Sequence, residues 1–169
     1  LRWLVRLVQL QHRWVGGLSP APPVVTGVLL GIWQQLRPVV LPQIQQQDYD
    51  ILWVENTVCW PVAAELLKRL RRRPPLIILN GHNIEYRLLQ QTGAVTPGVY
   101  GRYLRNESYL MRRMERAAFR QADLVLQCSA EDVADVQRLA PRSQAVVFPN
   151  GVDISRFPVQ PETRQDAAP

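Results

Sequence analysis

The chain has 169 residues, 47% of them hydrophobic, and its 20 Lys and Arg against 14 Asp and Glu give a formal net charge of +6. This size suits one domain with a core of its own and is too small for two full-sized α/β domains. The charge is compatible with an anionic membrane, nucleic acid or phosphorylated ligands, and equally with a solvated basic surface.

The two cysteines, Cys59 and Cys128, are too few for a disulfide framework and do not stand at metal-ligand spacing. We therefore expect no metal site and a reducing, cytoplasmic setting. The longest apolar run, residues 24–33, is well short of the ~20 residues that a membrane helix needs. The chain begins without Met, and we expect it to be a piece of a longer enzyme.

Helices are predicted for the first part of the chain. Residues 1–15 combine an apolar face with a basic one, so they predict an amphipathic helix that packs on the core or lies at a membrane interface. The basic face carries Arg2, Arg6, Gln9 and Arg13. Residues 24–37 predict a second helix, whose continuation is limited by Pro38 and Pro42.

From Asp48 onward, apolar strands alternate with helices. The predicted strands are residues 51–54, 76–79, 122–128 and 144–148. The predicted helices are residues 57–73, 84–91, 100–121 and 130–139, with a loop at 92–98. Asn83 is expected to cap the second of these helices, and Ser129 to open the last one through a capping box with Asp132.

This alternation predicts an α/β fold with a doubly wound parallel sheet, a Rossmann-like arrangement of three α/β/α layers. We expect a helical region at residues 1–47 and the Rossmann-like domain at 48–157. Residues 158–169 are Pro-rich and polar, and predict a linker or a disordered tail.

Polar residues follow the buried strand that begins at Leu76. The strand runs into Asn80-Gly81, and His82, Asn83 and Glu85 come next. In open α/β sheets, ligands bind beyond the carboxyl ends of the strands. Taken alone, His82 either hydrogen-bonds a neighbouring loop or contacts a phosphate or a sugar hydroxyl.

Glu55 ends the neighbouring predicted strand, so its carboxylate is expected to face the same crevice. Two carboxylates, Glu55 and Glu85, near a histidine indicate hydrogen bonding to a sugar or another polyol. The sequence contains no Gly-x-Gly-x-x-Gly, Walker A, Cys-x-x-Cys or Gly-x-Ser-x-Gly motif.

Four blocks carry a further signal through their order and spacing. They are Asp48–Glu55, Asn80–Glu85, Glu115 with Ala122–Ser129, and Phe148–Asp153 with Phe157. Together they resemble the N-terminal half of a family-4-type glycosyltransferase of the GT-B fold. The Pro-Asn-Gly-Val-Asp run is the most specific block. The resemblance covers residues 48–158, and residues 1–47 match poorly.

The resemblance implies a two-domain enzyme that transfers a sugar from a nucleotide-sugar to a glycan or lipid-linked acceptor, with no metal or other cofactor in the fold itself. This chain would be its acceptor-side domain, cytoplasmic and able to sit peripherally on the inner face of the membrane. By the family pattern His82 is the catalytic candidate, in the cleft between the domains. The substrate-binding candidates are Glu55, Asn83, Glu85, Asn150 and Gly151, whereas Glu115 and Asp123 are expected to be structural.

The chain also departs from the family pattern. No glycine-rich loop precedes Asp48, and the paired-Glu donor motif does not follow, so we expect weak or no binding of UDP- or GDP-sugars by this chain alone. One alternative is a GT-B-type sugar-nucleotide epimerase. Another is a non-catalytic module that uses the arginines of residues 68–73 and 102–120 to bind a membrane or nucleic acid. Nucleic acid is the weaker of these two partners because no known nucleic-acid motif is present.

Overall fold

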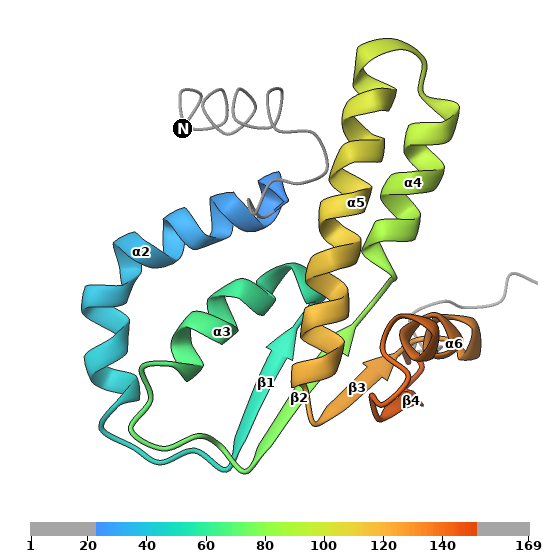
Figure 1. Ribbon diagram of the computed structural model, residues 1–169. Helices are drawn as coiled ribbons and strands as arrows, with labels where there is room; N and C mark the ends of the chain where they lie inside the picture. Colours follow the sequence, from blue (N-terminus) through green and yellow to red (C-terminus); the bar gives the residue numbers. More distant parts are fainter. Residues whose placement is uncertain (1–22, 152–169) are drawn as a thin grey trace, which may run out of the picture.

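Four parallel strands form the sheet of the domain, within residues 23–151, the part of the chain that the computed structural model describes (Figure 1). The strands are β1 (Ile51–Glu55), β2 (Leu76–Gly81), β3 (Leu124–Gln127) and β4 (Ala145–Val147). All are parallel in the order β1-β2-β3-β4, so the predicted Rossmann-like α/β fold is confirmed. This order follows the chain without a reversal, so the described strands contain no switch point of a doubly wound sheet. The predicted helix 1–15 and tail 158–169 lie outside the described residues.

Helices connect successive strands. They are the 3₁₀ turn η2 (Thr57–Cys59), α3 (Trp60–Leu67), α4 (Glu85–Val95), α5 (Gly98–Gln121) and α6 (Ala130–Leu139). Helix α2 (Val24–Ile44) precedes β1. Helix α3 has Pro61 in its first turn, but it ends at Leu67 rather than continuing through the arginines to residue 73, as predicted from the sequence. The basic segment 68–73 is therefore an exposed connection to β2.

The core lies between one face of the sheet and helices α3, α5 and α6. Side chains alternate across a strand, so Val54, Ile77, Leu79 and Val125 all point to this face. They pack with residues of the three helices, among them Trp60, Ala63, Ala118, Phe119, Val136 and Leu139.

The opposite face of the sheet is partly open to solvent. Ile51 and Trp53 of β1 are 52% and 45% exposed, and Val146 of β4 is 45% exposed. Among the described residues, this open face is the side on which Trp53 and Glu55 lie, because they stand two residues apart on one strand.

Helix α2 differs most from its prediction. It runs through both prolines to Ile44, so the expected limit at Pro38 was wrong. Each proline removes one backbone donor, and the helix accommodates the ring by bending, as Figure 1 shows. Within residues 23–151, α2 is long and apolar enough to cross a membrane, judged by length and composition only.

Helices α4 and α5 form a long hairpin that extends beyond the sheet (Figure 1). The predicted loop 92–98 was wrong, because α4 continues to Val95 and α5 starts at Gly98. A Cβ on Gly101 would lie 1.9 Å from the Thr96 carbonyl oxygen, so glycine permits this close turn. On α5, Met111 is buried and Ala117 is exposed.

Candidate functional site

Three side chains converge on the Glu55 carboxylate at the carboxyl edge of the sheet. Glu55 is paired in register with Asn80 of β2, whose Nδ2 donates to Glu55 Oε1 at 3.0 Å. His82 Nε2 lies 2.5 Å from the same oxygen. Trp53 Nε1 donates to Glu55 Oε2 at 2.6 Å. The structure thus brings the predicted residues Glu55 and His82 into direct contact.

These contacts favour the charged form of Glu55 and orient the imidazole of His82. The Trp53 hydrogen bond, followed by that of His82, lowers the pKa of Glu55 from its usual value. When the imidazole is neutral, a carboxylate that contacts Nε2 favours the proton on that nitrogen, which leaves Nδ1 as a hydrogen-bond acceptor. Because the imidazole is 37% exposed, a substrate hydroxyl can reach it.

Glu85 stands beside this cluster, in the first turn of α4. Burial raises the pKa of its carboxyl, and the Asn56 hydrogen bond and the His82 charge oppose that shift. Asn56 itself has a positive φ of 70°, and its Oδ1 accepts a hydrogen bond from Val58 N at 3.2 Å. The turn after β1 therefore faces the turn after β2.

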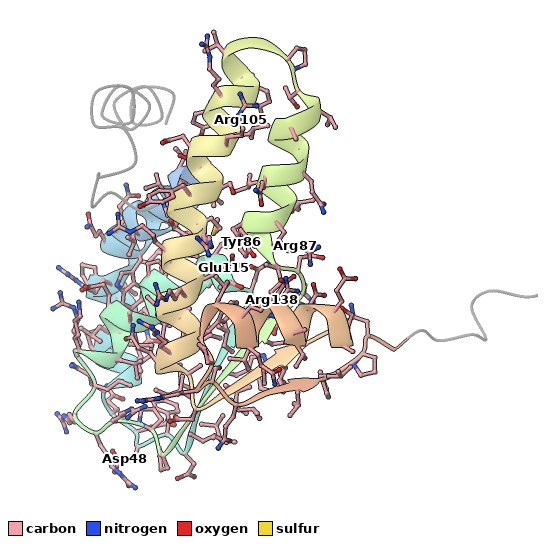
Figure 2. All side chains as sticks on the ribbon, turned by 45° about the vertical axis from the view of Figure 1, so that its right-hand side comes forward. Asp48, Tyr86, Arg87, Arg105, Glu115 and Arg138 are labelled. Atoms are coloured by element: carbon pink, nitrogen blue, oxygen red, sulfur yellow. The ribbon has the colours of Figure 1, made fainter. Side chains whose placement is uncertain are left out.

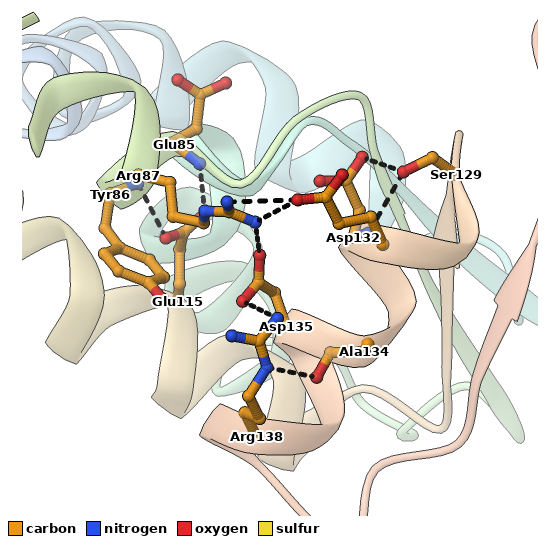
Figure 3. A network of polar contacts seen from close by, with 10 residues as sticks. Glu85, Tyr86, Arg87, Glu115, Ser129, Asp132, Ala134, Asp135 and Arg138 are labelled. Atoms are coloured by element: carbon orange, nitrogen blue, oxygen red, sulfur yellow. Dashed lines mark hydrogen bonds and ion pairs between the residues drawn. The ribbon is translucent and has the colours of Figure 1, made fainter. Parts of the chain in front are cut away.

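Asn83 is exposed and does not cap α4, so that expectation was wrong. The helix begins after Ile84 with no side-chain cap of its own. Glu115 of α5 takes this role: its Oε1 accepts from Glu85 N at 2.9 Å and its Oε2 from Tyr86 N at 3.1 Å (Figure 3). Burial raises the pKa of Glu115 to about 8, against the effect of these two hydrogen bonds.

An ion-pair network continues from this cap to α6 (Figure 3). Arg87 pairs with Asp135, which is 1% exposed, and with Glu131 at 3.2 Å. Arg138 Nη2 lies 2.7 Å from Asp135 Oδ1. The ion pairs connect α4 to α6, and Glu115 connects α4 to α5. These contacts fix the start of α4, the helix that follows the loop carrying His82.

The other expected structural residue, Asp123, connects two strands. Its Oδ2 accepts from Ile77 N at 2.8 Å, and its Oδ1 pairs with Arg73 at 3.4 Å. Glu115 and Asp123 therefore both have the packing roles that the sequence favoured.

Asn150 and Gly151 are exposed and follow β4 at the same edge of the sheet. Phe148 N donates to Gln127 O at 2.7 Å, which directs the chain past the end of β3. Two strand spacings separate β4 from β2, roughly 10 Å. The structure places Asn150 and Gly151 along the edge from His82 and does not bring them into its cluster.

The sequence interpretation missed Trp53, Asn80 and Gln127. Strand alternation places Trp53 on the face of Glu55, so the signal for it was present. The contact of Asn80 with Glu55 could be predicted only with the register of β1 and β2 known. Gln127 is fully buried at the end of β3, and a Cβ on Gly81 would lie 2.5 Å from its Nε2. Within residues 23–151, no group of three or more His, Cys, Asp or Glu is placed to hold a metal.

A protein-family model matches most of this chain. The model described as Glycosyltransferase Family 4 matches residues 6–156. The chain belongs to glycosyltransferase family 4. The family match begins well before Asp48, where the motif resemblance starts, so it also spans α2. Among curated proteins, no sequence matches this chain.

Proposed function

We propose that this family 4 domain is the acceptor side of an enzyme that transfers a sugar from a nucleotide-sugar to a glycan or lipid-linked acceptor. The observation that carries the proposal is the contact between His82 Nε2 and Glu55 Oε1, at 2.5 Å, on the carboxyl edge of a parallel sheet. Ligands of open α/β sheets bind at this edge.

In this proposal, His82 binds a sugar hydroxyl through Nδ1, and Glu55 positions the imidazole. Glu55 already accepts from Trp53, Asn80 and His82, so little of its hydrogen-bonding capacity remains for a substrate. This changes the expected role of Glu55 from binding the sugar to orienting His82. Asn83, Glu85, Asn150 and Gly151 remain candidates for contacts with the substrate along the edge.

Trp53 supplies an apolar surface next to these polar groups. Its side chain is 45% exposed while its Nε1 is used by Glu55. Sites that combine an aromatic surface with a few fixed polar groups suit small-molecule ligands. The ring of a sugar has the same two kinds of surface, apolar C–H faces and hydroxyl edges, so Trp53 and His82 can contact one sugar together.

A lipid-linked acceptor and a peripheral position on the cytoplasmic face of the membrane belong to the same proposal. Val25, Ile32, Leu36 and Val39 recur at helical spacing along α2 and are all exposed, by 45–65%. Gln45 Nε2 donates to Arg69 O at 2.6 Å, which joins the end of α2 to the basic segment 68–73. An apolar helix face beside a basic segment suits an anionic lipid surface. The proposed reaction uses no cofactor beyond the nucleotide-sugar.

The test is a transfer assay on the protein that carries this chain. Labelled UDP- and GDP-sugars are supplied with glycan and lipid-linked acceptors, and both the acceptor and the free sugar are analysed. The proposal expects label on an acceptor and its loss in His82→Ala, with His12→Ala as the matched histidine control. Release of an epimerised nucleotide-sugar without an acceptor product would support the epimerase instead, and transfer that is unaffected by His82→Ala would refute the assigned site.

A further inference from the structure

Three adjoining cavities form a trough along helix α5. The first, of about 430 Å³, lies between α4 and α5 and includes Tyr86, Arg105 and Arg112. The second, of about 350 Å³, lies between α5 and α6 and includes Arg112, Arg116 and Arg138. The third, of about 900 Å³, continues past the end of α5 and includes Arg120 and Arg142. The first two share Tyr109 and Arg112, and the last two share Pro141.

The sequence of α5 explains why these arginines lie on one face of the helix. Spacings of three or four residues bring side chains to the same face of a helix. The residues with this spacing are Arg105, Tyr109, Arg112, Arg116 and Arg120. At 1.5 Å per residue they extend over about 22 Å. The acidic side chain among the trough's lining residues is Asp123, which already pairs with Arg73.

Several of the arginines are held in place. Arg105 Nη1 donates to Gly93 O at 2.6 Å. The Arg112 guanidinium lies 5.9 Å from the centre of the Tyr86 ring. Arg138 is tied to Asp135 and to the Ala134 carbonyl. Figure 2 labels Arg105 near the free end of the α4–α5 hairpin and Arg138 on α6. Side chains fixed in advance lose less conformational entropy when they bind a ligand.

We propose that this trough binds an anionic glycan, as the part of the acceptor that extends away from the reacting end. Guanidinium groups bind carboxylates and phosphates through paired hydrogen bonds. Tyr109, which is 45% exposed, adds an aromatic surface between the first two cavities. The trough begins at Tyr86, in the first turn of α4, the helix that follows the loop carrying His82.

The shape and the aromatic content of the trough favour a glycan over other polyanions. A lipid surface is flat, whereas these cavities are recessed and follow one line. Single-stranded nucleic acid binds on a series of open aromatic rings, but of the two tyrosines here, Tyr86 is covered by Arg112. The choice of a glycan also rests on the proposed function.

The test is binding of a defined oligogalacturonate to the whole chain, measured by calorimetry at two salt concentrations. A malto-oligosaccharide of equal length is the neutral control, and single-stranded DNA and anionic vesicles are the competing polyanions. The variant is Arg116→Gln/Arg120→Gln, since both side chains are exposed. The control is Arg102→Gln, which removes charge from an exposed arginine of α5 that does not line the trough.

The proposal expects salt-sensitive binding of the charged glycan that weakens about tenfold in the trough variant, through loss of two charge-assisted contacts, and stays near wild type in the control. Equal weakening in both variants, equal binding of the neutral glycan, tighter binding of DNA or vesicles, or no binding would each overturn it. The binding measurement does not depend on sugar transfer, so the two proposals can fail separately. If the trough variant binds like the wild type while His82→Ala abolishes transfer, the trough fails and the proposed function stands. If glycan binds in the trough but no transfer is found, the trough proposal stands and the proposed function fails.

Discussion

Replacing Glu115 by alanine removes the carboxyl group with which α5 caps α4. Glu115 is fully buried and accepts from the backbone N–H groups of Glu85 and Tyr86. A buried donor left without an acceptor costs about 1–3 kcal/mol. The substitution leaves two such donors unsatisfied, and removing a poorly solvated carboxyl group offsets part of that cost. We therefore expect the free energy of unfolding to fall by about 2–4 kcal/mol.

The same residue predicts a pH dependence. The pKa of Glu115 is about 8 in the folded protein, against the usual 4.5 of a glutamate side chain. Between these values the folded state holds a proton that the unfolded state has released. This contribution to stability is complete below 4.5 and is lost as the pH rises through about 8. The folded protein is therefore expected to be less stable at about pH 9 than at about pH 6.

Urea unfolding followed by circular dichroism at both pH values measures the two effects. Glu115→Gln carries no titrating proton, so its difference between the two pH values should be smaller than that of the wild type. Glu131→Gln is the matched control, because Glu131 is 74% exposed and its change should stay within about 0.5 kcal/mol. A Glu115→Ala protein as stable as this control, or a Glu115→Gln protein with the full pH slope, would refute the assigned cap.

Three other substitutions test the framework around the site. Asp135→Asn should lower the free energy of unfolding by about 2 kcal/mol, because it removes the buried carboxylate that pairs with Arg87 and Arg138 and leaves Arg87 with its exposed partner Glu131; an unchanged thermal midpoint would contradict this. Gly101→Ala should cost about 3 kcal/mol, since the added Cβ meets the Thr96 carbonyl, whereas Gly151→Ala has open space and should be neutral. Trp53→Phe keeps an aromatic ring but removes a donor to Glu55, so the pKa of Glu55 should rise toward its usual value in a carboxylate NMR titration; an unchanged pKa would show that this hydrogen bond has no effect.

The strands and the last helix were predictable because their signals are local. Ser129 caps α6 as expected: its Oγ accepts from Asp132 N at 3.1 Å and lies 2.8 Å from Asp132 Oδ2. The contact between Glu55 and His82 was also predictable, because parallel strands end at one edge of the sheet.

What the sequence did not predict depends on contacts between distant segments. Asn83 looked like a cap, but Glu115, 30 residues from Glu85, supplies the acceptor instead. The contact of Asn80 with Glu55 requires the β1–β2 register. Pro38 does not end α2 because the helix bends. The arginines of α5 were visible as a charge pattern, but the trough exists only once α4 and α6 flank them.

The most direct test of the central claim, that Glu55 positions His82 for sugar transfer, is a double-mutant cycle on the transfer rate. Glu55→Gln, His82→Ala and the double variant are compared in the protein that carries this chain, with thermal unfolding as the check on folding. Loss of a positioning partner costs about 10–100-fold, and loss of the histidine about 100-fold or more. If Glu55 acts through His82, the double variant will be no slower than His82→Ala alone. Two losses that multiply in the double variant would show that the residues act independently, and would contradict this account.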